Sequence, residues 1–387
     1  MGNKSKKFST KCVHEGEIKD TMYQGIVSPL FMSTTYPWFG GDDPEKKPYP
    51  RYFNTPNQEF LSKKIASLEN GEKALIFTSG MAAISTSIMA NVKTGDHIVV
   101  QNDIYGGTRN FVLTEFDKFG IEYSFTDGLD PLKFSDQIKD NTVGIYLETP
   151  SNPLLKIVDL KSVSSIAKDN GVWTMIDNTF SSPVNQNPID HGIDIVLHSA
   201  TKYLGGHSDI SAGAVISTES RIEQILNSAK NFGGNLSDYT VWLLERSIKT
   251  LHIRVKEQTN NAKILAKMLD ENTNISKVYY PGLESHPSHE IAKSQMNDFG
   301  GMMSFDLNNN IDVYDFLKSL NLVKPGMSLA GVESTVNFPM KTSHGLMTQK
   351  ERDIQGIGDK LIRLSVGIES YEDIYEDLDQ AIKSSIK

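Results

Sequence analysis

Short apolar runs alternate with stretches in which apolar residues recur every three or four positions, from about residue 70 to residue 218. The first pattern predicts buried strands and the second predicts amphipathic helices. Strands are predicted at 73–79, 97–102, 121–127, 142–150, 172–178, 194–200 and 213–218, with helices at 80–91, 109–120 and 159–171. Such alternation is typical of parallel βαβ units, so we predict an α/β fold with a mostly parallel, doubly wound sheet.

Helical periodicity dominates after residue 219, with a long helical stretch at about 237–272 that we expect to break once near Lys249. Short strands at 277–282, 301–307 and 360–367 then mix with helices at 313–320 and 371–386. This order predicts a smaller α+β C-terminal domain. We therefore divide the chain into an α/β domain at 61–250 and a C-terminal domain at 251–387.

The first sixty residues are rich in proline and show no clear periodicity. A segment of this kind packs poorly on itself. We expect residues 1–60 to form an extended segment that lies on something else, including another subunit.

Charge and composition exclude several classes of protein. The chain has 39 basic and 48 acidic residues, a net charge of −9, which argues against nucleic acid as a partner. Its single cysteine, Cys12, excludes a disulfide framework and a Cys-rich zinc site, and we expect an incidental thiol near an exposed end. No apolar run reaches the length of a membrane-spanning helix, about 18 residues. We expect a cytoplasmic protein with no membrane partner and no metal site.

Gly80 follows the first predicted strand and opens a predicted helix. The backbone amides of such a turn, including that of Met81, could bind an anion such as phosphate. A helix start without a ligand explains the same residues, and a short glycine motif alone does not decide between the two.

Asp177 directly follows an apolar strand, so its carboxyl group is expected to be partly buried. Burial of a carboxylate costs free energy unless a cation or a donor lies near. The protonated ring nitrogen of a cofactor is one such cation. An Asx turn is the ordinary alternative for Asp-Asn-Thr.

Lys202 follows another predicted strand, shortly after Ser199 and Thr201. These two hydroxyl residues lie two apart in an extended chain and could both hold a phosphate. Burial or a nearby cation lowers the pKa of a lysine and lets it bond to an aldehyde. A surface lysine among turn residues is the alternative. Together with Gly80 and Asp177, however, these groups are those that pyridoxal 5′-phosphate requires, on strand ends of one sheet.

Ten stretches along the chain then resemble the Cys/Met-metabolism family of pyridoxal-phosphate enzymes, which includes cystathionine γ-synthase, cystathionine γ-lyase, cystathionine β-lyase and methionine γ-lyase. They are SGMAAI (79–84), YGGT (105–108), ETPSNP (148–153), DNTF (177–180), HSATKYLGGHSD (198–209), KTLHIR (249–254), YPGLESHPSH (280–289), FGGMMSF (299–305), SLAGVES (328–334) and RLSVG (363–367). The resemblance implies the transferase fold type I and a homotetramer, built as a dimer of dimers with shared active sites.

The resemblance also implies roles toward the cofactor. Lys202 would bond to its aldehyde and later take the substrate's α-proton. Tyr105 would stack on the ring and assist proton transfer, and Asp177 would pair with the ring nitrogen. The phosphate would be held by Gly80, Met81, Ser199 and Thr201.

Further residues would serve the substrate and the neighbouring subunit. Arg363 would clamp the substrate carboxylate, a task suited to its planar guanidinium group. Ser328 would also bind substrate, and Asn152 would lie near the ring hydroxyl or the substrate. Tyr49 and Arg51 would reach the phosphate in the neighbouring subunit.

The implied activity is that of a carbon–sulfur lyase of trans-sulfuration. Such an enzyme eliminates the γ- or β-substituent of cystathionine, or a related sulfur amino acid, to give a 2-oxo acid, ammonia and a thiol. The alternatives are γ-replacement on O-acyl-L-homoserine, as in cystathionine γ-synthase, and methionine γ-lyase activity.

Three features bear on this choice. The SLAGVES stretch looks most like the γ-lyase and γ-synthase branch. Gly107 stands where methionine γ-lyases typically carry cysteine, which lowers the case for that activity. Met327 stands where the γ-branch often has glutamate. A thioether cannot bind the distal amino group of cystathionine as a carboxylate can, so Met327 favours a less polar substrate or relaxed specificity.

Overall fold

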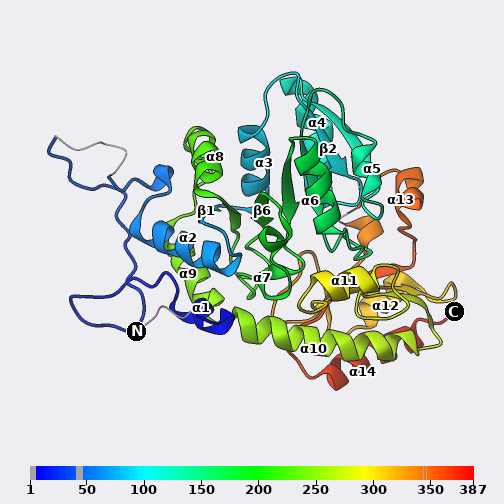
Figure 1. Cartoon of the computed structure of the whole chain (residues 1–387). Coiled ribbons are helices and arrows are strands. Elements are labelled where there is room, and N and C mark those ends of the chain that lie inside the picture. The colour runs from blue at the N-terminus through cyan, green and yellow to red at the C-terminus, as the bar shows by residue number, and fades with distance from the viewer. Residues whose placement is uncertain (1–5, 41–46, 343, 346) are drawn as a thin grey trace.

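The computed structural model describes residues 6–40, 47–342, 344–345 and 347–387, and it contains two sheets (Figure 1). The large sheet consists of β1 (Lys73–Phe77), β2 (His97–Gln101), β3 (Glu122–Thr126), β4 (Thr142–Glu148), β5 (Trp173–Asp177), β6 (Ile195–His198) and β7 (Gly213–Ser217). The small sheet consists of β8 (Ile275–Tyr279), β9 (Met302–Leu307), β10 (Lys324–Pro325), β11 (Thr335–Asn337) and β12 (Leu361–Ser365).

Helices surround both sheets. Those that precede β8 are α1 (Phe8–His14), α2 (Pro56–Leu68), α3 (Gly80–Ala90), α4 (Gly106–Phe119), α5 (Leu132–Ser135), α6 (Leu160–Asp169), α7 (Ser182–Asn185), α8 (Glu219–Phe232), α9 (Asp238–Ile248) and α10 (Leu251–Asp270). Those that follow it are α11 (His289–Gln295), α12 (Val313–Ser319), α13 (Gln349–Gln355) and α14 (Tyr371–Ser384). Short 3-10 turns are formed by η2 (Pro50–Tyr52), η3 (Pro188–His191) and η4 (Pro339–Lys341).

The large sheet confirms the predicted α/β architecture. Its order is β1-β7-β6-β5-β4-β2-β3, and every strand except β7 runs in the same direction. Helices α3, α4 and α8 pack against one face and helices α2 and α6 against the other. Because both faces are covered, the central strands are buried along their whole length, as in other parallel sheets.

Strand β7 departs from the parallel pattern that simple strand–helix alternation predicts. It pairs antiparallel with both β1 and β6. Parallel neighbours need a crossover connection, usually a helix, whereas residues 199–212 form only an irregular loop between β6 and β7. This loop carries Lys202, so the reversal turns the lysine-bearing segment back across the end of the sheet.

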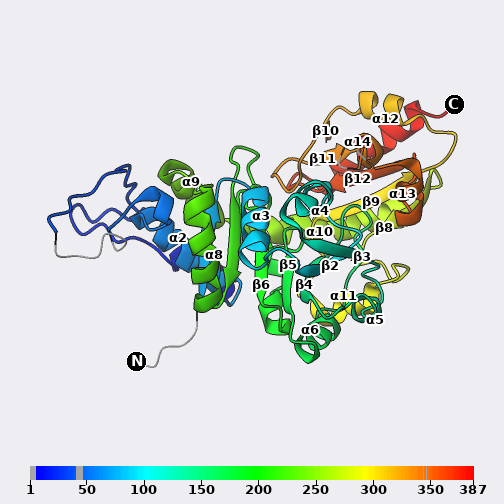
Figure 2. The ribbon, with the colours of Figure 1, turned by 90° about the horizontal axis from the view of Figure 1, so that it is seen from above.

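The second half of the chain also follows the predicted order. The predicted break near Lys249 is confirmed, since α9 ends at Ile248 and α10 begins at Leu251. Figure 2 shows the small sheet with α12 and α14 at the opposite end of the molecule from the N-terminal segment. The small sheet is mostly antiparallel and has its own apolar core. The three-part division at residues 60 and 250 remains a prediction, and residues 1–5 and 41–46 of its first part lie outside the described residues.

The start of the chain is more ordered than its composition suggested. Helix α1 forms there, and Cys12 on it is completely buried, so the expectation of an incidental thiol near an exposed end was wrong. The buried Lys64 amine of α2 donates to the backbone carbonyls of Cys12 (3.0 Å) and Val13 (3.1 Å). These bonds satisfy carbonyls at the end of α1 and hold it on α2.

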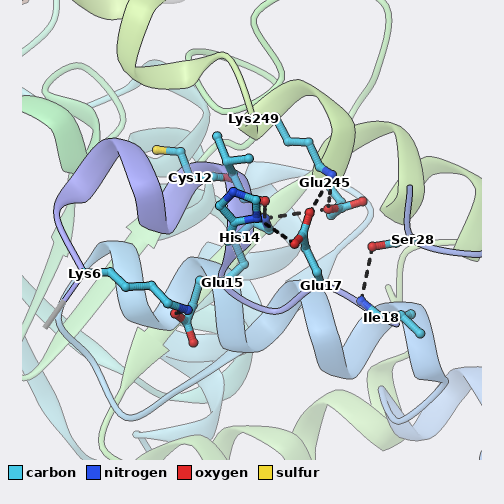
Figure 3. Close-up of polar contacts among 11 residues, drawn as sticks. Lys6, Cys12, His14, Glu15, Glu17, Ile18, Ser28, Glu245 and Lys249 are labelled. Atoms are coloured by element: carbon cyan, nitrogen blue, oxygen red, sulfur yellow. Dashed lines mark hydrogen bonds and ion pairs between the residues drawn. The ribbon is translucent and has the colours of Figure 1, made fainter. Parts of the chain in front are cut away.

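A chain of ion pairs continues this anchor (Figure 3). Lys64 lies 3.6 Å from Glu245, which lies 3.6 Å from Lys249. Lys249 in turn contacts Glu17 at 3.0 Å, and Glu17 contacts His14 at 3.0 Å. Sequence periodicity could not reveal this anchor, because it joins residues far apart in the chain.

Among the described residues, no helix is long and apolar enough to cross a membrane.

Candidate active site

A cavity of about 690 Å³ opens where the strands of the large sheet end. The polypeptide reaches it directly after β1, at the ends of β4 and β5, and in the loop after β6. It brings together eleven of the expected site residues: Gly80, Met81, Tyr105, Asn152, Asp177, Ser199, Thr201, Lys202, Met327, Ser328 and Arg363. Neither Tyr49 nor Arg51 lines the cavity of its own chain.

One end of the cavity is shaped for an anion. Helix α3 begins here, capped by Ser79, whose Oγ accepts from the Ala82 amide at 3.1 Å. A Cβ on Gly80 would lie 2.8 Å from Cβ of Ser199, so only glycine lets these two segments come this close. The helix N-terminus and the Ser199–Thr201 segment therefore form one cradle, in which a phosphate would meet amide donors and hydroxyl groups.

Asp177 lies beyond this cradle, as the last residue of β5. It accepts from the Thr179 amide at 3.0 Å, which is the Asx turn that the sequence left as an alternative. Burial raises the pKa of the Asp177 carboxyl, and the hydrogen bonds from Thr179 and the charges of His198 and Lys202 oppose this rise. No lysine, arginine or histidine among the described residues lies within ion-pair distance of this carboxyl group. A protonated ring nitrogen would supply the missing cation.

Lys202 faces the same space from the loop after β6. Its Nζ donates to Oγ of Ser328 at 2.5 Å. Burial, and then the positive charge of Arg363, lowers the pKa of Lys202 to about 8, and Asp177 partly opposes this shift. About a tenth of an amine with this pKa is neutral at pH 7, far more than of an ordinary lysine, and the neutral form can bond to an aldehyde.

Arg363 projects from β12 into the cavity and is almost fully buried. Its guanidinium group donates to Oδ1 of Asn152 at 2.9 Å and to the backbone carbonyl of Ser328 at 3.1 Å. Burial lowers the pKa of Arg363 to about 10, and the charge of Glu148 opposes this effect. Asn152 therefore orients the guanidinium group, which leaves it suited to bind a carboxylate.

Tyr105 stands at the N-cap position of α4, lines the cavity and is partly exposed. Its backbone amide donates to Oε2 of Glu148 at 2.7 Å. A Cβ on Gly107 would lie 2.5 Å from the Tyr105 ring and 3.2 Å from the Met81 sulfur. The ring thus rests on Gly107, which explains why a larger side chain does not fit there with the ring in this position.

Several cavity residues escaped the sequence analysis. Burial, and then the charge of Asp177, raises the pKa of Glu148 well above its usual range. Glu148 opens the ETPSNP stretch, so the motif marked the segment without indicating the role of its first residue. The cavity is also lined by His344, Asn337 and Glu351, which come from a loop, the end of β11 and helix α13 and had no comparable signal in the sequence.

The lysine loop is also supported from behind. Buried Arg254 donates to the backbone carbonyl of Tyr203 at 2.9 Å and to that of Ser247 at 3.1 Å. A Cβ on Gly206, where φ is +71°, would collide with this guanidinium group at 1.8 Å. The absence of a side chain at Gly206 therefore leaves room for the guanidinium group of Arg254, which fixes the loop that carries Lys202.

Arg51 lies away from the cavity of its own chain. Its guanidinium group donates to the backbone carbonyl of Lys230 at 2.7 Å and lies 5.5 Å from the ring of Tyr49. Among the described residues, no group of three or more His, Cys, Asp and Glu side chains is placed to hold a metal ion.

The cavity combines an anion cradle, a lysine of lowered pKa and a buried acid with no cationic partner among the described residues. These groups fit pyridoxal phosphate, and they define the class of pyridoxal-dependent enzymes. The sequence matches the family model described as Cys/Met metabolism PLP-dependent enzyme over residues 9–383. The chain belongs to this family, and its cofactor is pyridoxal 5′-phosphate.

Relatives with different named activities are similar to this chain to nearly the same degree. It is 42% identical to a cystathionine beta-lyase of Lactococcus lactis, covering 97% of this chain and 99% of the relative. It is 40% identical to a cystathionine gamma-lyase of Bacillus subtilis, covering 98% of this chain and 100% of the relative. A solved cystathionine gamma synthase of Xanthomonas oryzae superposes with a TM-score of 0.95, at 35% identity over 99% of each chain. The predicted fold type I is thereby confirmed.

The lowered pKa of Lys202 leads to a testable pH dependence. In cofactor-free protein, reductive trapping of an aldehyde on Lys202 should reach half its maximal rate near pH 8, because the neutral amine reacts and burial disfavours the ammonium form. For an ordinary lysine, the half-maximal rate would come at a pH of about 10.4. Mass spectrometry of the trapped peptide measures the rate.

Arg363→Gln serves as the companion variant. Removing this positive neighbour should move the midpoint for Lys202 upward. A midpoint near that of an ordinary lysine in the unchanged protein, or one that does not move in Arg363→Gln, would contradict this account.

Proposed function

We propose that this chain is a carbon–sulfur lyase that acts on cystathionine or a related sulfur amino acid. It eliminates the β- or γ-substituent and yields a 2-oxo acid, ammonia and a thiol. The observation that carries the proposal is a pair of hydrogen bonds to Ser328. Lys202 donates to its Oγ at 2.5 Å, and Arg363 donates to its backbone carbonyl at 3.1 Å. An amino acid whose carboxylate lies on Arg363 therefore presents its α-carbon close to the Lys202 amine.

The cavity residues have different roles in this reaction. Arg363 binds the carboxylate, and Asn152 keeps the guanidinium group in place. When bound, the cofactor withdraws electrons from the α-carbon, so that a proton can be removed there. The free Lys202 amine, poised by its lowered pKa, takes this proton.

Departure of the sulfur requires a second proton transfer. The carbon–sulfur bond breaks with its electron pair on sulfur, which becomes a thiol once it is protonated. Lys202 in its ammonium form or the Tyr105 hydroxyl supplies that proton, since both face the cavity. Water then releases ammonia and leaves the 2-oxo acid.

The relatives support a lyase, because two of those described above are named cystathionine lyases. An assay of the purified holoenzyme with cystathionine tests the proposal. Pyruvate would identify β-elimination and 2-oxobutyrate would identify γ-elimination. The proposal fails if neither acid forms from cystathionine, homocysteine, cysteine or methionine.

The alternative is γ-replacement, supported by the similarity to the Xanthomonas oryzae synthase. In that case, cysteine and O-succinyl- or O-acetylhomoserine would yield cystathionine. A lack of product with both esters would exclude it. Methionine γ-lyase activity is a further alternative, and methionine in the same assay addresses it.

Met327 provides a specificity test. It lines the mouth of the cavity with 77% of its side chain exposed, where a thioether offers no charge to the distal amino group of cystathionine. Met327→Glu should raise the kcat/KM ratio of cystathionine over methionine by up to roughly fivefold, the strength of an exposed ion pair. Met327→Gln is the uncharged control of the same size. An unchanged ratio in Met327→Glu, or an equal rise in Met327→Gln, would count against this role.

We further propose that the enzyme assembles as a dimer of dimers with shared sites, in which Tyr49 and Arg51 reach the cofactor phosphate of the neighbouring subunit. The N-terminal segment supports this, because Ile26 is 94% exposed and Phe39 is 95% exposed in the single chain. Apolar side chains this exposed favour burial against another surface.

The cytoplasmic location remains a prediction.

A mixing experiment tests the shared site. Lys202→Ala and Arg51→Ala should each be inactive alone, but coexpression should restore about a quarter of the wild-type activity, since half of the random dimers have one intact site. Coexpression of Lys202→Ala with Asp177→Ala is the control. Both of those residues line the cavity of one chain, so no activity should return. Failure of the first pair to recover would refute the shared site.

A further inference from the structure

Glu69 is a buried carboxylate directly behind the cofactor site, and it does not line the cavity. It follows the last residue of α2, and its side chain is completely shielded from solvent. Oε1 contacts Nε2 of His198 at 2.5 Å and accepts from Nδ2 of Asn178 at 2.8 Å. Oε2 accepts from Nδ2 of Asn187 at 3.2 Å. Three side chains therefore converge on one carboxylate.

Two of these three partners, Asn178 and His198, belong to the segments that reach the cavity. Asn178 is the residue after Asp177, at the end of β5. His198 is the last residue of β6, and the segment that begins with Ser199 and leads to Lys202 follows it directly. One carboxylate oxygen thus bonds to both strand ends.

The network extends beyond Glu69 to neighbouring groups. The backbone NH of Asn178 donates to the Leu197 carbonyl at 2.9 Å. The side chain of Asn178 donates from Nδ2 to the backbone carbonyl of Gln186 at 2.9 Å, and its Oδ1 accepts from Nε2 of Gln186 at 3.0 Å. Hydrogen bonds in a buried polar network hold its members in one arrangement, and removal of one member leaves its partners unsatisfied at a cost in free energy. Glu69 is the member shared by both strand ends.

Charge adds a second contribution. The carboxylate of Glu69 holds the His198 ring by its contact with Nε2, so it sets where that ring lies relative to Asp177. The positive charge of His198 in turn favours the ionised form of Asp177, the acid on the neighbouring strand. Asp177 needs that form to pair with a protonated ring nitrogen.

We propose that Glu69 is a positioning residue for the cofactor. It fixes the strand end that carries Asp177 against the strand end that leads to Ser199 and Lys202, and it holds the His198 ring behind Asp177. The role applies to a lyase and to a synthase alike, because cofactor binding precedes either reaction. Its test therefore stands or falls separately from the proposed activity.

The test measures cofactor binding to the cofactor-free protein. Glu69→Gln places an amide NH₂ where Asn187 needs an acceptor and removes the carboxylate that contacts His198. It should raise the dissociation constant for pyridoxal phosphate by roughly tenfold or more, and it should shift the visible absorbance and circular dichroism of the bound cofactor. Both readouts are independent of turnover.

His198→Gln separates the two contributions. Its side-chain amide can still donate to Glu69, but it carries no charge. It should weaken cofactor binding less than Glu69→Gln does, while still shifting the absorbance of the bound cofactor. If Glu69→Gln does not fold, His198→Gln alone decides the question, and wild-type affinity together with a wild-type spectrum would overturn the proposal.

Glu245→Gln is the matched control. Glu245 is also a buried glutamate with a cationic partner, Lys64 at 3.6 Å, but it lies outside the cavity and belongs to the anchor of the N-terminal helix. It should lower the thermal midpoint but leave the dissociation constant of the cofactor within about twofold of wild type. Wild-type cofactor binding in Glu69→Gln would refute the proposal. So would an equal weakening in Glu245→Gln at the same loss of thermal stability.

Discussion

The structure depends on a set of charges held out of water at one edge of the large sheet. Asp177 and Glu148 bring two carboxyl groups into the cavity, and Lys202 and Arg363 bring two cations. Burial disfavours the charged form of each of them, which is why the pKa values of the acids rise and those of the bases fall. An isolated buried charge would be very costly, so these groups are tolerable only as a set that the cofactor completes.

This constraint explains the contacts around the cavity. Ser328 bonds to both cations of the set, Lys202 through its hydroxyl group and Arg363 through its carbonyl. Its φ of +79° is unusual for a residue other than glycine, and such backbone strain is concentrated at functional sites. The same residue thus links the amine that moves protons to the guanidinium group that binds the substrate carboxylate.

A second layer holds these groups in place from outside the cavity. Arg254 supports the carbonyls behind Lys202, and Glu69 joins the ends of β5 and β6. Neither side chain lines the cavity. Precise placement of reacting groups contributes strongly to catalysis, so residues of this layer are as much a part of the site as those that line it.

The sequence by itself determined the class of fold and most of the cavity. Alternating strands and helices follow from local periodicity, and the carboxyl ends of parallel strands must meet at one edge, so Gly80, Asp177 and Lys202 could be assigned to one site from their positions alone. Only the tertiary structure decided that β7 runs antiparallel, that α1 is anchored with Cys12 buried, that Glu148 lines the cavity and that Glu69 contacts the ends of β5 and β6. The physical reason is that these features arise from contacts between residues far apart in the chain, which leave no periodicity or spacing in the sequence.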